Sequence, residues 1–220
     1  EATNKEGEPM RRVFFALAIL AFSAFAGNVW IEPGPAGGST DQDYLQYDDG
    51  SPSWLTWAGA YRGVWFNTDD FVPSMIGFNL DFSEYWMYHH SSYPWDVSDF
   101  YAEIWNGDYM GPLVALDEQT VTALHYAPVF ANYSPQVAAE SNFWGIEDTS
   151  MSAGGWPAMM GDATPPAVDH SYFSDDFFVW EPWSDGTNTG DLLTRVEGDF
   201  QPDTSGVLES VTWGNIKVTF

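Results

Sequence analysis

The chain has 220 residues, no cysteine and a formal net charge of −26 at pH 7. Such an acidic surface repels phosphate backbones, which proteins bind through lysine and arginine, so nucleic acid and anionic membranes are excluded as partners. Without cysteine, neither a disulfide nor a thiolate metal site forms. Acidic disordered chains contain few aromatic residues. This chain is aromatic-rich, with 12 Trp, 11 Tyr and 16 Phe, and we expect it to build a core.

Residues 10–26 have the order of a secretory signal peptide. Met10 precedes two arginines, an apolar run and Ala24-Phe25-Ala26, a small-x-small cleavage signal. We expect cleavage after Ala26, a protein that is secreted or held at the cell surface, and no membrane insertion after cleavage. A transmembrane anchor needs roughly 20 apolar residues and a pilin stem a longer run, so both are weaker alternatives. Residues 1–9 precede Met10, the expected start methionine, and we expect them to be an upstream extension or an expression remnant.

Residues 27–43 are rich in Gly, Pro and Ser and are expected to be a flexible segment leading into the domain. Short strand signals follow. Ile76–Phe82 alternates apolar and polar residues, and Phe100–Trp105 is closed by the turn signal Asn106-Gly107-Asp108. Further strands are expected at residues 63–67, 113–116, 121–126, 142–147, 177–181 and 192–197. The pattern predicts an all-β fold, an antiparallel β-sandwich of jelly-roll type over residues 44–198.

Residues 199–220 are predicted to be a linker and a C-terminal tail. The linker interpretation depends on the run from Gly198 to Gly206, which also contains Pro202. In the tail, Ile216, Val218 and Phe220 alternate, which permits an edge strand docked on the domain. The alternative is a short segment that export or anchoring machinery recognises.

Several short motifs resemble those of uncharacterised exported bacterial β-sandwich domains. They are Tyr47-Asp48-Asp49-Gly50, Gly63-Val64-Trp65-Phe66, Ala102-Glu103-Ile104-Trp105 with Gly111-Pro112, Asn142-Phe143-Trp144, and Gly190-Asp191-Leu192-Leu193-Thr194-Arg195-Val196-Glu197. The resemblance spans roughly residues 44–198 and implies a β-sandwich in a secreted or surface protein. It carries no activity with it, and the chain lacks a recognisable sorting domain.

No catalytic residue is nominated by the sequence. His89 and His90 are adjacent, so on a strand they point to opposite faces and make a poor metal pair, and His125 and His170 are isolated. No G-x-S-x-G motif occurs. Carboxylate pairs such as Asp69/Asp70 are common, and a glycoside hydrolase needs two carboxyl groups about 5–10 Å apart across a cleft. With so many acids in the chain, that spacing is expected to arise by chance.

Calcium is the cofactor that the acidic turns could bind. The richest oxygen donors in turn contexts are Asp48, Asp49, Asp185, Asn188 and Asp191. The EF-hand spacing is missing, so a calcium site would have to gather ligands from separate loops. Two simpler interpretations compete with it. Asp and Asn side chains stabilise their own turns by bonding to nearby backbone, and the acidic charge keeps an exported protein soluble.

Aromatic residues crowd a Ser/His/Pro-rich stretch that we expect to be a loop. They are Tyr85, Trp86, Tyr88, Tyr93 and Trp95. Exposed Trp and Tyr rings stack on sugar rings, so these five residues are the candidate ligand-binding set. In the competing interpretation, the loop folds over the sandwich and the rings cover its core. We expect Trp86 to be in the core and Trp95 to be exposed.

Two functions are consistent with these patterns. The first is an exported, non-catalytic β-sandwich module with a binding or structural role, for which a glycan or another cell-surface component is the candidate partner. The second is a secreted glycan-degrading hydrolase that uses a carboxylate pair. A groove lined by aromatic residues and two facing carboxylates would favour the hydrolase. A surface with scattered acids would favour the binding module.

Overall fold

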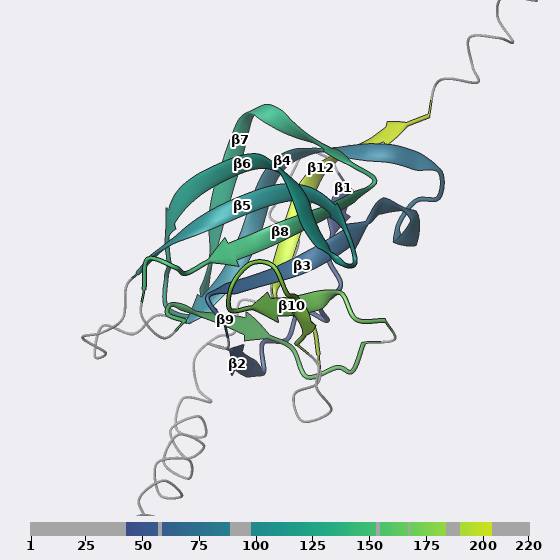
Figure 1. Ribbon diagram of the computed structural model, residues 1–220. Helices are drawn as coiled ribbons and strands as arrows, with labels where there is room; N and C mark the ends of the chain where they lie inside the picture. Colours follow the sequence, from purple (N-terminus) through teal and green to yellow (C-terminus); the bar gives the residue numbers. More distant parts are fainter. Residues whose placement is uncertain are drawn as a thin grey trace, which may run out of the picture. The chain divides into compact units, whose positions relative to one another are not determined.

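The computed structural model describes residues 43–56, 59–88, 98–152, 155–166, 168–183 and 190–203. The predicted signal sequence at 10–26 and the predicted tail beyond Asp203 lie outside these ranges. Apart from one short 3-10 helix, the regular secondary structure of the described chain is all strand (Figure 1). Its elements are β1 (Asp43–Leu45), β2 (Trp54–Thr56), β3 (Tyr61–Asn67), the 3-10 helix η1 (Thr68–Asp70), β4 (Met75–Tyr88), β5 (Asp99–Asp108), β6 (Gly111–Thr122), β7 (Ala127–Glu140), β8 (Asn142–Asp148), β9 (Ala158–Gly161), β10 (Ser171–Ser174), β11 (Glu181–Pro182) and β12 (Thr194–Pro202).

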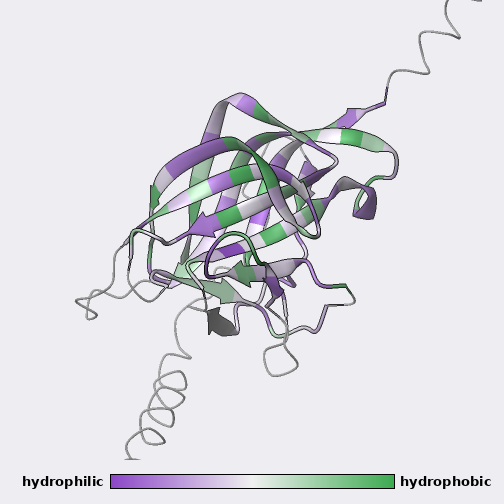
Figure 2. Cartoon of the chain, in the orientation of Figure 1, coloured by the Kyte–Doolittle hydropathy of each residue, from purple (hydrophilic) through white to green (hydrophobic). Residues whose placement is uncertain are grey.

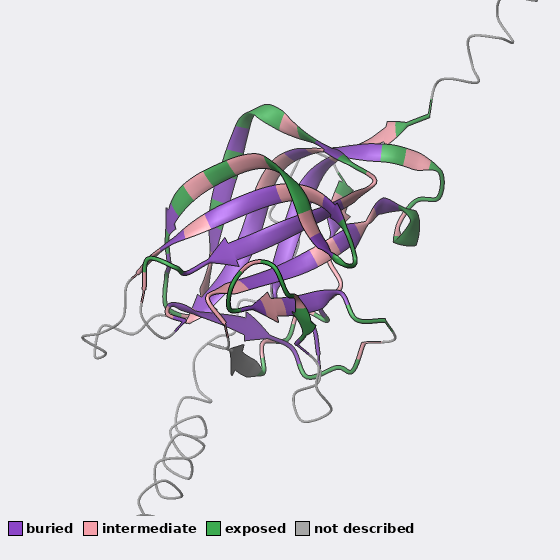
Figure 3. Cartoon of the chain, viewed as in Figure 1, coloured by how far each residue is buried: buried purple, intermediate pink, exposed green. Residues whose placement is uncertain are grey.

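The strands form two antiparallel sheets. The first has the order β1-β12-β4-β9-β2, with β7 also paired to β4. The second has the order β11-β10-β3-β8-β5-β6. The strands at the centre of the second sheet are mostly buried, while β6 at its edge is largely exposed (Figure 3). The predicted all-β antiparallel sandwich is therefore confirmed.

The core lies between the two sheets, because inward-facing side chains of both sheets meet there. Phe78 of the first sheet stacks on Phe143 of the second, with ring centroids 6.1 Å apart. Tyr85 meets Phe100 edge-on at 5.5 Å. All four side chains are fully buried. Hydrophobic and hydrophilic residues alternate along the strands (Figure 2), which is the pattern of strands with one face on a core.

Several strand boundaries differ from those predicted. β4 continues to Tyr88, so residues 85–88 are strand and not loop, because β4 pairs there with β7, β9 and β12. Residues 177–180 are not strand, because the Asp176 carboxylate accepts hydrogen bonds from the backbone N–H of Phe178 and Val179 and holds a turn. Asn106-Gly107-Asp108 ends β5, and the turn follows at residues 109–110. β7, with two prolines, was not predicted.

The expected boundary at residue 198 is also wrong in position, because β12 continues to Pro202. Gly198 was interpreted as the start of a linker, but it lies at a β-bulge where the register of β12 on β4 shifts. A Cβ at this position would lie 1.9 Å from the carbonyl oxygen of Asn79. Only glycine fits so close to the neighbouring strand, so this glycine serves a bulge inside the sheet.

Both arginines of the described part are buried in ion pairs. Arg62 donates from Nε and Nη2 to the carboxylate of Glu147 at 2.5 and 2.8 Å, and neither side chain is exposed. Arg195 binds Asp48 and Glu84 in the same way. Since no other lysine or arginine occurs in the described ranges, their surface carries no exposed lysine or arginine.

Candidate ligand-binding site

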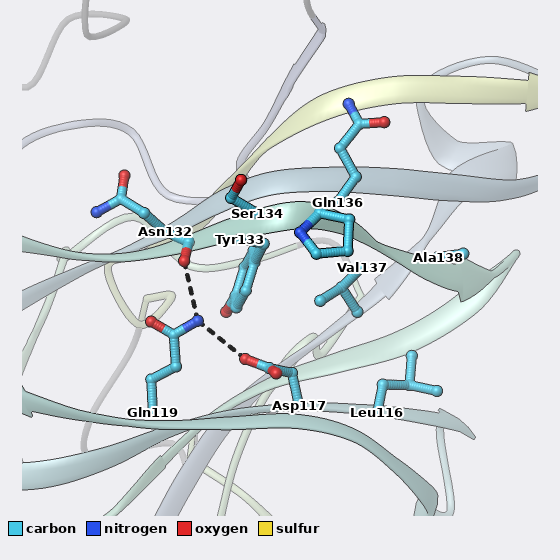
Figure 4. A pocket seen from close by; sticks show the side chains of 10 residues that line it. Leu116, Asp117, Gln119, Asn132, Tyr133, Ser134, Gln136, Val137 and Ala138 are labelled. Carbon is cyan, nitrogen blue, oxygen red and sulfur yellow. Dashed lines mark hydrogen bonds between the residues drawn. The ribbon is translucent and has the colours of Figure 1, made fainter.

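A groove of about 390 Å³ runs between β6 and β7, where one edge of each sheet meets (Figure 4). Its floor is formed by Tyr133 with Leu116 and Val137. The Tyr133 hydroxyl is hydrogen-bonded to Ser83 Oγ at 2.7 Å, which fixes the ring in place. Asp117 and Gln119 of β6 point into the groove, whereas the side chains of Asn132 and Ser134 on β7 point away from β6, on the opposite side of the strand from Tyr133 (Figure 4).

The groove exists because β7 bulges away from β4. Val137 is paired with Leu80 and Asn132 with Phe82, so the residues between them have only Asp81 opposite. Gln119 of β6 closes the groove at one end, because its amide donates to the carbonyl of Asn132 and to the carboxylate of Asp117, both at 3.0 Å. This bridge between the sheets holds the groove in a defined shape.

Two side chains of β7, on the opposite side of the strand from Tyr133, face solvent without a protein partner in the described ranges (Figure 4). Asn132 and Ser134 are exposed, and neither side-chain amide nor hydroxyl has a hydrogen-bond partner there. Asp117 uses one carboxylate oxygen for Gln119 and keeps the other for a further donor. Inside the groove, Asp117 and Gln119 thus offer carboxylate and amide oxygens as acceptors, a set that matches a neutral ligand whose hydroxyl groups donate hydrogen bonds.

A second hollow of about 330 Å³ lies on the other side of Leu116 and Asp117, against the outer face of the second sheet. Ile104 pairs with Asp117 and Trp105 with Ala115, so Leu116 is the extra residue of a bulge between the two hollows. The second hollow contains the ring of Trp105 and the carboxyl groups of Glu103 and Glu118. Because Glu103 and Glu118 are directly paired across β5 and β6, their side chains share one face.

Burial raises the pKa of Glu103 to about 7, and the nearby carboxylates of Asp148 and Glu118 add to the rise. One hydrogen bond opposes it, since Trp105 Nε1 donates to Glu103 Oε2 at 2.7 Å. The side chain is 5% exposed. Near neutral pH this carboxyl group therefore exists in both protonation states and can donate or accept a hydrogen bond inside the hollow.

The aromatic residues predicted to bind a ligand do not line either hollow, and the prediction is wrong for two of them. Tyr85 and Trp86 are buried on opposite faces of β4, so they belong to the core and not to an exposed aromatic surface. Trp86 packs with Met160 and Leu193, as expected for a residue that covers the core. Tyr88 is half-buried and meets Tyr126 edge-on at 5.0 Å. Tyr93 and Trp95 lie outside the described residues.

Three residues of the predicted calcium set meet around a fourth acid, Asp162. Asp162 accepts the backbone N–H groups of Asp49 and Asp191, both at 2.7 Å. Asp48 is bound to Arg195, and Asp191 accepts from Ser171 Oγ at 2.9 Å. These carboxylates are engaged by protein donors, and within the described ranges no group of three or more side chains is arranged to hold a metal ion. Asp185 and Asn188 lie outside those ranges.

Neither hollow was predicted from the sequence. Asn132, Ser134 and Gln119 belong to no motif, and their position depends on the bulge of β7 and on the pairing of two distant strands. For Trp105 the sequence predicts a place in a strand and in a short motif, but no ligand contact. The one available signal was Pro135 within a run of otherwise strand-like residues, because proline in a strand often marks an edge or a bulge.

No protein-family model matches this chain, and comparisons with curated proteins and with solved structures also give no match. No helix in the part of the chain that the structure describes is long and apolar enough to span a membrane.

Proposed function

We propose that this protein is an exported β-sandwich module that binds a neutral glycan along β6, in the two hollows on either side of Leu116. The observation that carries the proposal is the pair of polar side chains that points into the first groove, Asp117 and Gln119, where Asp117 keeps one carboxylate oxygen that Gln119 does not bind. Sugar hydroxyls donate hydrogen bonds, and the carboxylate and amide oxygens of these two side chains accept them. The Trp105 ring in the neighbouring hollow adds an apolar surface for a sugar face.

The charge of the surface supports a neutral ligand over an acidic one. The described surface has no exposed lysine or arginine, so a uronic acid or sulfated sugar would find no cation to bind there. A neutral polysaccharide needs no cation, so the absence of exposed lysine and arginine does not weaken its binding. Export is part of the same proposal, since residues 10–26 have the order of a signal peptide. N-terminal sequencing of the secreted protein should then begin near Gly27, and an intact hydrophobic N-terminus in membranes would reject it.

The test is a glycan array followed by calorimetry on the best neutral ligand. Gln119→Ala and Asp117→Ala should each weaken binding about tenfold or more, because each removes a polar group that points into the groove and that the ligand would use. Thr120→Ala is the matched control. It is exposed on the same strand but lies outside both hollows, and it should leave affinity unchanged. If no neutral glycan binds, or if all three variants behave alike, the proposal fails.

The second candidate function is a glycan hydrolase, and the second hollow is the observation that supports it. Glu103, with its pKa raised to about 7, and the paired Glu118 are the two carboxyl groups that a retaining or inverting mechanism would need. Glu103 would donate its proton to the leaving glycosidic oxygen, and Glu118 would act as nucleophile or base. Release of new reducing ends from the bound glycan, abolished by both Glu103→Gln and Glu118→Gln, would establish it. Binding without release supports the non-catalytic module.

A further inference from the structure

Large apolar side chains are exposed mainly in two segments of the second sheet. Of twelve such side chains exposed in the described part, six belong to the β5–β6 hairpin and to residues 178–179. We call these six the display surface: Tyr109, Met110, Leu113, Val114, Phe178 and Val179. Phe178 is 86% exposed and Leu113 is 72% exposed. Soluble proteins rarely leave such side chains together in water unless they bind something.

The two segments are joined through tryptophan rings. Trp144 Nε1 donates to the carbonyl of Asp108 at 2.9 Å, directly before the hairpin turn. The ring of Trp144 lies 4.9 Å from that of Trp180, which follows Val179. Trp180 in turn lies against Gly111, where a Cβ would come within 3.0 Å of its ring. The hairpin tip and the 178–179 turn therefore lie next to each other.

The exposure of these side chains is fixed by the surrounding structure. Phe177 and Trp180 turn inward and pack with each other at 5.7 Å, which leaves Phe178 and Val179 pointing out. Asp176 Oδ1 accepts the backbone N–H groups of both outward residues at 2.9 and 3.1 Å. On the hairpin, Leu113 lies at a register shift of the β5–β6 pair. A surface held in one conformation loses little entropy when it binds.

The charges around the display surface decide what kind of partner fits. Asp108, Asp175 and Asp176 are exposed beside it, and the described surface has no exposed lysine or arginine to balance them. A second copy of this chain, with its net charge of −26, would be repelled. A partner with an apolar centre and a basic rim would be attracted.

We propose that the display surface docks a polypeptide whose apolar face is flanked by lysine or arginine. The apolar face covers Met110, Leu113, Phe178 and Val179, and the basic side chains reach the three exposed aspartates. This interaction is separate from glycan binding, because none of the six display residues lines either hollow.

Three synthetic helical peptides test the proposal, with the whole protein and fluorescence anisotropy in about 150 mM salt, where long-range attraction is screened. The first has a leucine face and lysines elsewhere, the second replaces leucine by serine, and the third replaces lysine by glutamate. We expect only the first to bind well. Met110→Ser/Phe178→Ser should weaken that binding about tenfold or more. The control Ile76→Ser/Val168→Ser removes two similarly exposed apolar side chains elsewhere and should leave it unchanged.

Five results would overturn the proposal. If the leucine–lysine peptide does not bind, the display surface does not dock a polypeptide with an apolar face and basic flanks. Equal binding of the serine–lysine peptide would show attraction by charge alone, and equal binding of the leucine–glutamate peptide would show that the basic rim is irrelevant. Equal loss in both double variants would show that the site is elsewhere. Sedimentation velocity completes the set, since a dimer that Met110→Ser/Phe178→Ser dissolves would make a second copy the occupant.

Discussion

Arg195 and Asp48 form a buried ion pair between residues separated by 147 positions in the sequence. Arg195 Nε donates to Asp48 Oδ2 at 2.9 Å, and neither side chain is exposed. Arg195 also reaches Glu84 Oε1 at 3.3 Å, and Tyr44 donates to the other oxygen of Glu84. The pair therefore links the loop after β1 to β12, and the contact of Arg195 with Glu84 extends this link to β4.

Asp48→Ala should lower the free energy of unfolding by about 3–5 kcal/mol, because it leaves the Arg195 guanidinium buried with an incomplete set of acceptors. Urea unfolding at neutral pH measures the loss. Asp43→Ala is the matched control: Asp43 is an exposed aspartate of β1, and its removal should change stability by less than about 0.5 kcal/mol. Similar losses in the two variants would contradict the ion-pair account.

The sequence predicts some strands of this fold but not the contacts that join distant strands. Alternation identified the first half of β4 at Ile76–Phe82, because Phe78 and Leu80 lie on the face that packs on the core. It could not identify β7, where two prolines and the exposed Phe130 hide the period, nor the bulge that opens the groove. Asp48 was predicted as a turn residue or metal ligand. Its true partner, Arg195, is brought to it only by the pairing of β1 with β12.

Arg62→Lys should cost about 3 kcal/mol, although it keeps the positive charge, because it leaves buried acceptors of Arg62 unpaired. Arg62 binds both oxygens of Glu147 and also donates to the carbonyls of Gly155 and Pro157, at 2.9 and 2.8 Å. A lysine ammonium donates from one point and cannot reach all of these acceptors. Thermal unfolding would report the loss. An Arg62→Lys variant as stable as the original would show that charge alone, without the fork geometry, holds this end of the sandwich.

Stability should fall as the pH rises from about 5 to about 8. Burial raises the pKa of Asp191 and that of Glu103 to about 7, above the values near 4 in an unfolded chain. The folded protein then binds more protons than the unfolded chain between these values, so the contribution of both groups is full below about pH 4 and is lost as the pH passes 7. Urea midpoints across this range measure the slope. Asp191→Asn should flatten it, and an unchanged slope would contradict the assignment.

Salt should stabilise the folded protein. The described surface carries no exposed lysine or arginine, so its many carboxylates repel one another without compensation. The screening length falls from about 10 Å at 0.1 M to about 3 Å at 1 M salt, which weakens this repulsion. The melting temperature in NaCl should rise over that range, and less steeply for Asp43→Asn/Asp175→Asn. A melting temperature that falls with salt would mean that attractive surface pairs outweigh repulsion.

Gly198→Ala should destabilise the domain by about 3 kcal/mol or more, although alanine is the smallest possible change. A Cβ at this bulge would meet the Asn79 carbonyl oxygen at 1.9 Å and the Asn79 carbonyl carbon at 2.8 Å. Both atoms are backbone of β4, so no side chain can turn aside, and β12 has to separate from β4 locally. Gly63→Ala is the informative comparison. Its Cβ would lie 3.1–3.3 Å from two side chains and one carbonyl oxygen, which permits a smaller adjustment and a smaller loss. Equal urea midpoints for the two variants would show that Gly198 is not a required bulge residue, and would return the residues after it to the linker interpretation.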